Sequence, residues 1–327
     1  MARVFIGIPT LNRPAMVVDA IESVRRQTFP DCRVIVSDNH SDGNAGEIVR
    51  NYVESLDDPR FAFHEQPENI GEYGQGRFFL QEAEDHEFFM ILHDDDVLDP
   101  GYIEAAISAL DTHPSAAFFV ANYYCIDETG KRWPEQTMRY LRHLGRTQAS
   151  EGLIDVLSSH VMHGFTPISG TLFRKRSLDE SGYVDPDCYG NYPFEANVFL
   201  RLGETGAKAW FSTSSLLGIR FHRGSLRSGN YMVGSARTCL RMWGRRRFTG
   251  SLERRRKMIM GRFYRADALN RMRTGDLTGA RASLFAAMRE NPCSVRLWGV
   301  MPLALIAPGI LRTLASRTAA PNASKFS

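Results

Sequence analysis

Apolar runs and amphipathic segments alternate along the first 126 residues of the chain. In the first amphipathic segment, Val17, Val18, Ile21 and Val24 share one helical face, and Asn12 is a candidate N-cap. The same spacing of apolar residues predicts helices at 12–27, 45–56, 74–85 and 101–113. Short apolar runs predict strands at 3–8, 32–38, 61–66, 87–93 and 116–126. This alternation predicts an α/β fold with a largely parallel sheet and helices on both faces.

The pattern changes after residue 126. Residues 127–190 are irregular and rich in Gly, Pro and Ser, with one short strand expected within 163–178. A helix is predicted at 192–206, followed by a strand at 207–212. From about residue 232 onward the sequence is mainly helical.

Positive charge is concentrated near the C-terminus. The net charge is only +3, but the segment from Arg220 to Arg273 holds 16 Lys or Arg residues and two acids. No nucleic-acid recognition module accompanies it, so nucleic acid is not an expected partner. The uncharged segment 297–311 is shorter than the roughly 20 residues of a membrane-spanning helix. Two interpretations remain open: peripheral membrane contact through 220–315, or a solvated helical face with a packed C-terminal helix.

The five cysteines are widely spaced and form no C-x-x-C pair. Neither a disulfide framework nor a zinc knuckle is therefore predicted. The first residues lack the long apolar core and the cleavage site of a secretory signal. We expect a cytoplasmic location, with peripheral attachment to the inner face of the membrane as the alternative.

Three predicted strands end in polar clusters: PTLNR at 9–13, SDNHSD at 37–42 and HDDD at 93–96. In open α/β sheets, ligands bind beyond the carboxyl ends of the strands. One such cluster is as easily a solvated turn, but three together indicate a binding site. Mg²⁺ and Mn²⁺ prefer oxygen ligands, and substrate phosphates often complete their shell. Strand alternation would point Asp94 and Asp96 the same way, with Asp96 the better metal candidate.

Four segments together carry a family resemblance. They are FIGIPTLNRPAMVVDAIESVRRQTF, VIVSDNHSDGNAGEIV, ENIGEYGQGRFFLQEA and FFMILHDDDVLDP. In order, spacing and residue types they resemble the nucleotide-sugar half of glycosyltransferase family 2, which has the GT-A fold. The resemblance implies a donor-binding half at 1–126 and an acceptor-binding, catalytic half at 127–231 of one GT-A domain. Residues 232–327 would form a helical, basic C-terminal region close to the membrane.

The resemblance also implies a donor site. In it, Asp38 would accept a hydrogen bond from the ring N–H of the base. The segment from Asn69 to Arg77 would close over the nucleotide, and Arg77 either meets a phosphate or is an exposed helix residue. The nucleotide-binding residues would be Pro9, Thr10, Asn12, Arg13, Asp38, Asn39, Asn69, Gly71, Arg77, Asp94 and Asp95. The metal, Mn²⁺ or Mg²⁺, would be held by Asp96, Asp94 and His222.

The family's catalytic base belongs to a Glu-Asp pair before a helix that often ends in Arg-Leu. Counting back from Arg201, Glu195 matches the family's Asp, and Phe194 replaces the preceding acid. Glu195 would deprotonate the acceptor; the alternative is a glutamate stabilised by the helix dipole. His222 is either a metal or phosphate contact or a structural histidine. His93 is a further departure, because family members commonly carry an acid there.

The resemblance implies a metal-dependent glycosyltransferase that moves a sugar from a nucleoside-diphosphate sugar to a hydroxyl or amine. The acceptor would be a glycan, a lipid-linked molecule or a small molecule. A UDP-sugar is the favoured donor, with dTDP- and GDP-sugars as alternatives, and single displacement would invert the anomeric centre. Because an acid is missing at Phe194, a nucleotide-sugar binding protein without transferase activity is the competing hypothesis. A nucleotidyltransferase ranks lower, because PTLNRP has no glycine for a phosphate loop.

Overall fold

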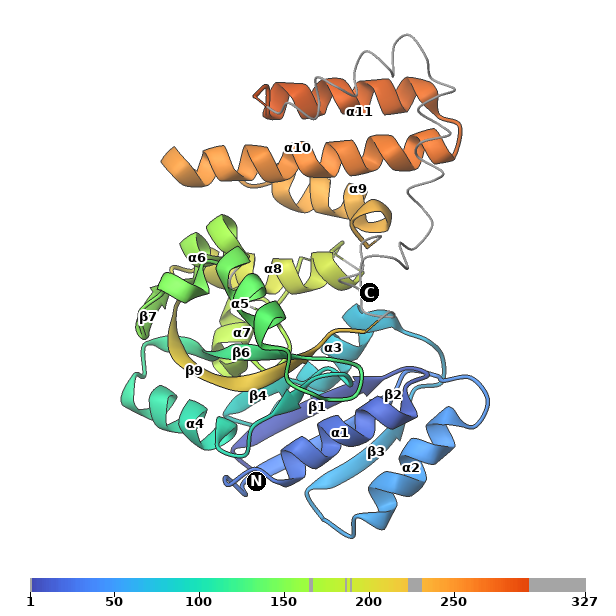
Figure 1. Ribbon diagram of the computed structural model, residues 1–327, viewed down its shortest axis with the longest axis vertical. Helices are drawn as coiled ribbons and strands as arrows, with labels where there is room; N and C mark the ends of the chain where they lie inside the picture. The colour runs from blue at the N-terminus through green and yellow to red at the C-terminus, as the bar shows by residue number, and fades with distance from the viewer. Residues whose placement is uncertain (1, 165–166, 186, 189, 223–230, 294–327) are drawn as a thin grey trace. The chain divides into compact units, whose positions relative to one another are not determined.

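The computed structural model describes residues 2–164, 167–185, 187–188, 190–222 and 231–293 (Figure 1). The chain divides into two compact units, and each is described by itself. Unit 1 consists of Met1–Asp185 and Phe194–His222, and unit 2 of Pro186–Pro193 and Arg223–Ser327. The apolar segment 297–311 and part of the basic block lie outside the described residues.

Unit 1 is built on one mixed sheet, which has nine strands in the described part of the chain. Strands β3, β2, β1 and β4 lie side by side and parallel, and β8 is inserted antiparallel between β4 and β6. Strand β9 is parallel to β6, while β5 and β7 pair antiparallel with β9. The strands are β1 (Val4–Thr10), β2 (Cys32–Asp38), β3 (Phe61–Glu65), β4 (Phe88–Ile91), β5 (Val97–Leu98), β6 (Ala116–Ile126), β7 (Gly152–Asp155), β8 (Leu172–Arg174) and β9 (Lys208–Arg220).

Helices cover both faces of this sheet, and β1 shows how. Its Val4, Ile6 and Ile8 point into a core shared with α1, α2 and α4, whereas Phe5 points into a second core with α3, α7 and α8 (Figure 1). Alternate side chains of the strand therefore pack against the helices on opposite faces of the sheet. The helices are α1 (Pro14–Arg25), α2 (Ala45–Ser55), α3 (Gly71–Glu82), α4 (Tyr102–Thr112), α5 (Pro134–His143), α6 (Val156–His163), α7 (Lys175–Ser181) and α8 (Asn191–Glu204), with a 3₁₀ turn at Arg146–Gln148. The predicted α/β fold, mostly parallel and covered on both faces, is confirmed.

Two regions differ from the predicted elements. The stretch 127–190, expected to be irregular, contains α5, α6 and α7. Helix α5 is mostly polar and buries only Leu141, so its narrow apolar face does not distinguish it from the polar sequence around it. Strand β9 runs far beyond the predicted 207–212. The prediction ended early because the centre of the strand, Thr213–Ser215, is polar and exposed and lies where the register with β6 shifts. A β-bulge of this kind hides a strand from pattern analysis.

Asn12 does not cap α1. The N-cap residue is Arg13, which makes no side-chain capping bond. Asn12 adopts a left-handed backbone with φ 57°, and its Nδ2 donates to Asp42 Oδ2 at 2.9 Å. Its Oδ1 accepts from the backbone N–H of Asp42 at 2.7 Å. The side chain therefore joins the ends of β1 and β2 instead of beginning a helix.

Unit 2 contains three described long helices: α9 (Tyr231–Gly244), α10 (Gly250–Arg273) and α11 (Leu277–Glu290). The predicted helical character from about residue 232 is confirmed as far as residue 290. Small side chains, including Ala268, Ala280 and Ala287, form the α10–α11 core. Asp267 is buried on α10 and accepts hydrogen bonds from the hydroxyl of Ser283 and from two arginines. Among the helices that could be described, none is both long and apolar enough to cross a membrane.

Candidate active site at the strand ends

The ends of β1 and β2 and the residues that follow β4 lie at one edge of the sheet. Thr10 is opposite Asp38, and Gly7 is opposite Ile91, two residues before His93. Gly7 lets α3 approach this edge, because a Cβ there would lie only 2.4 Å from Cγ of Phe79. The three polar clusters predicted from sequence are therefore neighbours in space.

At the β2 end, Asp38 is buried and its carboxylate is already hydrogen-bonded. Its Oδ2 accepts from the backbone N–H of Ser41 at 2.9 Å, and its Oδ1 accepts from the Ser41 hydroxyl. A Cβ at Gly46 would lie 2.8 Å from Oδ2, so α2 packs directly against this carboxylate. In this conformation Asp38 shapes the loop after β2, and its contact with a base stays a prediction.

Asn39 connects the β2 end to the start of α3. Its Nδ2 donates to Asn69 Oδ1 at 3.0 Å, and its Oδ1 accepts from the backbone N–H of Ile70 at 3.0 Å. The backbone N–H of Gly71 also donates to Asn69 Oδ1 at 3.0 Å. Gly71 has φ +67°, a backbone that glycine adopts readily. Both asparagines thus hold the segment predicted to cover the nucleotide.

The remaining predicted pocket residues separate into two groups. Pro9 and Thr10 end β1, with Thr10 buried and Pro9 half-buried, and Arg13 follows within contact of the aspartates. Arg77 is exposed on α3, as the alternative interpretation described it. A role for Arg77 at a phosphate is thus the least supported of the nucleotide assignments.

Asp94 contacts the β1 end and the residues after it. Its Oδ2 accepts from Thr10 Oγ1 at 3.0 Å, and its Oδ1 from Arg13 Nη1 at 3.0 Å. Burial raises the pKa of Asp94 to about 6, opposed by Arg13 and reinforced by the neighbouring Asp95. Asp94 therefore carries unfavourable charge in the ligand-free chain, which is common at binding sites.

Residues 93–96 form a turn, closed by the backbone N–H of Asp96 donating to the carbonyl of His93 at 3.2 Å. Strand alternation does not apply in a turn, so Asp94 and Asp96 do not share one direction on that ground. One atom each of His93, Asp95 and Asp96 could ligate a metal, and these atoms lie within 4.8 Å of one another. His222 Nε2 lies 2.9 Å from Asp95 Oδ2, which brings the fourth strand end to the cluster.

Arg220, the last residue of β9, fixes this turn. Its backbone N–H donates to Asp96 Oδ1 at 3.1 Å, and its Nε donates to the Asp95 carbonyl at 3.0 Å. Its Nη2 pairs with Asp19 Oδ2 at 2.8 Å, and Nη1 donates to the carbonyl of Glu128 at 3.2 Å. The guanidinium is 2% exposed, so it acts as a buried clamp.

Helix α8 carries Glu195, the predicted base. The helix is anchored where Asn197 Nδ2 donates to Asp185 Oδ2 at 2.7 Å and Arg201 Nη1 donates to Asp185 Oδ1 at 2.8 Å. Phe194, at the position of the family's missing acid, is fully buried. The arginine used to count back to Glu195 is therefore a structural anchor of its helix.

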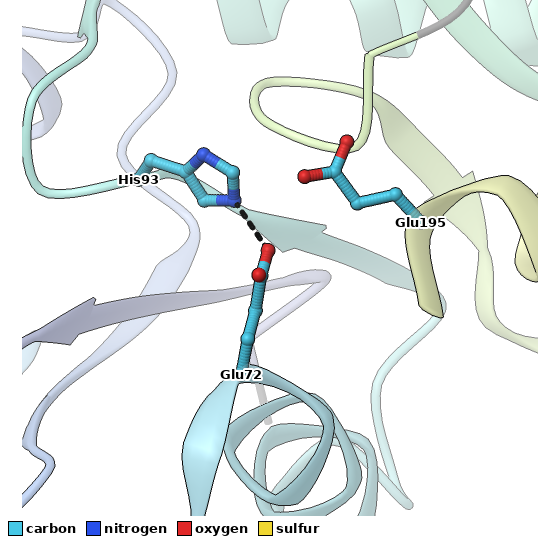
Figure 2. A group of neighbouring side chains, drawn as sticks. All are labelled: Glu72, His93 and Glu195. Atoms are coloured by element: carbon cyan, nitrogen blue, oxygen red, sulfur yellow. Dashed lines mark ion pairs between the residues drawn. The ribbon is translucent and has the colours of Figure 1, made fainter. Parts of the chain in front are cut away.

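Glu195 has two neighbours that motif reasoning did not assign. His93 Nε2 lies 3.4 Å from Glu72 Oε1, and Figure 2 shows Glu195 with its carboxylate toward the same imidazole. Burial lowers the pKa of His93, but Glu72, and then Glu195, outweigh it and raise the pKa to about 10. In the sequence Glu72 is simply an acid at the start of a helix, so no signal marked it. His93 was visible only as a departure from the family pattern.

This architecture, with carboxylates at the ends of parallel strands, is the one found in glycosyltransferases of the GT-A fold. The family model of glycosyl transferase family 2 matches residues 5–179. The chain belongs to glycosyl transferase family 2, which confirms the resemblance found in the sequence.

Curated relatives are distant and longer than the matched part. The chain is 28% identical to an uncharacterized protein y4gI of Sinorhizobium fredii, over 43% of this chain and 16% of that protein. It is 27% identical to the GalNAc(5)-diNAcBac-PP-undecaprenol β-1,3-glucosyltransferase of Campylobacter jejuni, over 62% of this chain and 60% of that protein. A poly-β-1,6-N-acetyl-D-glucosamine synthase of Staphylococcus epidermidis is 25% identical over 54% of this chain and 40% of its own length. The chain therefore spans less than two thirds of each of these relatives.

Solved structures share the fold over nearly the whole chain. S. aureus TarS 1–349 in complex with UDP-GlcNAc superposes with a TM-score of 0.64 at 14% identity, covering 97% of this chain and 91% of that one. The mannosyltransferase PcManGT from Pyrobaculum calidifontis, in complex with GDP-Man and Mn²⁺, has a TM-score of 0.55 at 17% identity, covering 97% and 84%. At these identities the likeness establishes the GT-A fold alone.

Proposed function

We propose that the chain transfers a glycosyl group from a nucleoside-diphosphate sugar to an acceptor hydroxyl, with Glu195 as general base. The observation that carries the proposal is that the Asp94–Asp96 turn lies at one edge of the sheet, where a ring nitrogen of His93 lies within 4.8 Å of a carboxylate oxygen of Glu195. His93 has a ligand-capable atom within 4.8 Å of Glu195 and also one within 4.8 Å of Asp95 and Asp96, which supports a single site for the proposed base and the proposed donor-site aspartates. The named glucosyltransferase relative supports the same reaction class.

In the proposed reaction the acceptor oxygen attacks the anomeric carbon while the bond from that carbon to the diphosphate oxygen breaks. The acceptor proton passes to a carboxylate oxygen of Glu195, and the electron pair of the broken bond leaves with the nucleoside diphosphate. A single displacement of this kind inverts the anomeric centre. A positioned base typically contributes about 10²–10⁴-fold to such a rate.

The residues suited to hold Mn²⁺ or Mg²⁺ are Asp96 and Asp95, with His93 and His222 beside them. The ligand-capable atoms of His93, Asp95 and Asp96 are mutually close, and carboxylate oxygens match a hard divalent cation. A cation bound there would neutralise charge on the diphosphate. Asp94 remains the alternative ligand, although its bonds to Thr10 and Arg13 favour a role in holding Arg13.

Asp96→Ala tests both the metal and the reaction. The variant should lose nearly all donor turnover, and calorimetry should show weaker binding of Mn²⁺ with UDP or GDP. Asp58→Ala is the matched control, because Asp58 pairs with Arg60 away from the strand ends. Unchanged turnover in Asp96→Ala would remove the metal assignment. Binding of a nucleotide sugar without transfer to any acceptor would favour the non-catalytic alternative.

A thermal-shift panel of UDP, dTDP and GDP with Mn²⁺ identifies the base. A ligand that binds only the folded chain raises its apparent stability by mass action. We propose a UDP-sugar as the donor, in line with the UDP-GlcNAc carried by the TarS structure. A larger shift with GDP or dTDP than with UDP would replace that choice.

We further propose that the acceptor is a lipid-linked glycan and that the chain works in the cytoplasm against the inner membrane face. The named Campylobacter relative acts on an undecaprenyl-diphosphate-linked acceptor. In unit 2, α10 exposes Arg254, Lys257, Met258 and Arg262 at spacings of three, four and eight residues. Basic residues near an anionic lipid surface each contribute about 1 kcal/mol to binding.

Vesicle sedimentation tests the membrane contact. The full chain should pellet with phosphatidylglycerol vesicles and remain in solution with phosphatidylcholine. Reversing the charges of Arg254, Lys257 and Arg262 to Glu should abolish pelleting. The same reversal at Arg139 and Arg142, exposed on α5, should not. A chain that stays in solution with anionic vesicles contradicts this part of the proposal.

A further inference from the structure

Three side chains from separate parts of unit 1 converge, and one of them is the proposed base (Figure 2). Glu72 lies in the first turn of α3, His93 follows β4, and Glu195 lies in α8. Each offers one ligand-capable atom, and these atoms lie within 4.8 Å of one another. The imidazole therefore has a carboxylate on α3 and another on α8 as neighbours.

The surroundings of His93 are rich in negative charge. Glu72 Oε1 lies 3.4 Å from His93 Nε2, and carboxylate oxygens of Glu195, Asp95 and Asp96 lie within 4.8 Å of a ring nitrogen. The backbone N–H of His93 donates to Ser169 Oγ at 3.1 Å, which fixes the residue at the end of β4. The ring stands between the carboxylates of α3, α8 and the aspartate turn, which would otherwise face one another directly.

The family's Glu-Asp pair is incomplete in this chain, and the core explains why. Phe194 makes edge-on ring contacts with Tyr73 and Tyr183, at centroid distances of 6.2 and 5.7 Å. A Cβ at Gly76 would lie 2.5 Å from Phe194 Cζ, so α3 packs directly on this ring. Position 194 is therefore committed to packing, and the second carboxylate near Glu195 comes from Glu72 instead.

We propose, on the basis of the function proposed above, that Glu72 and His93 are positioning residues for Glu195. Glu72 holds the imidazole of His93, and the imidazole holds the Glu195 carboxylate in the direction of the acceptor. This pair supplies the second carboxylate that position 194 lacks. Neither residue touches the reacting atoms, so both act through Glu195.

The test measures donor binding and turnover separately. Release of nucleoside diphosphate from UDP-GlcNAc, UDP-glucose and GDP-mannose, with water as acceptor, gives kcat and KM for the most reactive donor. Calorimetry gives the affinity for Mn²⁺ with the matching nucleoside diphosphate. Glu72→Gln and His93→Gln should lower kcat at least tenfold and change the nucleotide affinity less than threefold.

Non-additivity gives the sharper result. In a Glu195→Gln background, Glu72→Gln and His93→Gln should cause no further loss, because both act through the base. The matched controls are Glu22→Gln, a half-buried glutamate of α1, and His86→Gln, a histidine packed on Phe5. Both controls should keep wild-type kcat.

Three outcomes overturn the positioning role: an unchanged kcat in both variants, a fall in nucleotide or Mn²⁺ affinity as large as the fall in kcat, or a further loss in the Glu195→Gln background. If Glu72→Gln does not fold, His93→Gln carries the same comparison. A wild-type chain that turns over no donor overturns the proposed function and this proposal with it. An active wild-type chain with unaffected variants overturns the positioning role alone.

Discussion

Asp94 in unit 1 and Asp267 in unit 2 are both buried aspartates, yet the pKa of the first carboxyl is raised and the pKa of the second is lowered. Burial acts to raise the pKa of Asp267, but hydrogen bonds from Ser283, Arg271 and Arg237 hold the pKa below its usual value. Burial raises the pKa of Asp94 to about 6, because Arg13 and Thr10 only partly compensate and Asp95 adds a like charge.

The difference separates a structural carboxylate from a functional one. Asp267 is surrounded by donors on α9, α10 and α11, so its charge stabilises the helical unit. Asp94 stands in a turn with two further aspartates, where the negative charge exceeds what the neighbours neutralise. This excess negative charge is unfavourable in the ligand-free chain, and a cationic or hydrogen-bonding ligand would compensate it.

The largest expected effect is on Glu195. Glu195→Gln should lower kcat for sugar transfer by about 10²–10⁴-fold, because the amide cannot accept the acceptor proton. The melting temperature of the chain should stay within a few degrees of wild type. Steady-state kinetics and a thermal scan of the same preparation measure both. A variant that keeps more than a tenth of the wild-type kcat would contradict the assignment of the base.

Asp267→Asn should show the reverse pattern. Removing the charge weakens the hydrogen bonds from Ser283, Arg271 and Arg237, and a hydrogen bond to a charged group contributes about 1.5–3 kcal/mol, although water can solvate the 63% exposed Arg237 side chain. Hydrogen exchange of amides in α10 and α11 should report that loss of stability. Nucleotide affinity, measured below the new unfolding transition, should not change. Full protection of α10 in the variant would show that the charge network is dispensable.

In the metal-free chain, acid should change the stability of the two units in opposite directions. The folded pKa of Asp94, about 6, lies above its unfolded value of about 3.9, so the folded state binds the proton first as pH falls. The contribution of Asp94 to the free energy of unfolding should therefore rise by on the order of 3 kcal/mol between pH 7 and pH 4. For Asp267 the lowered pKa gives the opposite sign, and its stabilisation is lost as pH falls below about 4.

Hydrogen exchange in EDTA as a function of pH measures both slopes. Asp94→Asn isolates the first, since the variant should lack the rise in stability of unit 1 on acidification. Equal pH profiles for wild type and Asp94→Asn would contradict the raised pKa of this carboxyl.

The smallest expected effect comes from one hydroxyl. Ser283 Oγ donates to Asp267 Oδ2 at 2.6 Å, and a hydrogen bond to a charged group contributes about 1.5–3 kcal/mol. Ser283→Ala should lower the stability of unit 2 by roughly the lower end of that range, about 1.5 kcal/mol. Ser251→Ala, at an exposed serine of α10, is the control and should change it by less than about 0.5 kcal/mol. Equal losses of stability in both variants would show that the Ser283 hydroxyl does not stabilise the Asp267 carboxylate.

The regular part of the fold was predictable because it repeats a local pattern. Strands β1, β2 and β4 are apolar runs and α1 is an amphipathic helix, so their periodicity appears in the sequence. Helix α5 is mostly polar and buries a single leucine, and β9 contains a polar bulge, so neither has the long apolar pattern that predicts a buried element. Their existence depends on tertiary contacts.

The site was predictable to the level of motifs and not of contacts. The motifs located the strand ends and Glu195. The prediction that Asp94 and Asp96 point the same way assumed a strand, but residues 93–96 form a turn. Asn12 was misread as a cap, because its partner Asp42 is 30 residues away. The Glu72–His93 pair joins residues on different elements, which spacing in the sequence does not encode.

Arg220 has a consequence for how the molecule is made. Its partner Asp19 lies 201 residues earlier in the chain. A ribosome that adds about 5–20 residues per second needs roughly 10–40 s to travel from one to the other. The aspartate turn ends 124 residues before Arg220, so it exists for roughly 6–25 s without the guanidinium that later fixes it. The donor edge therefore matures late in synthesis, and a fragment ending at residue 126 contains the motifs without the clamp that holds them in register.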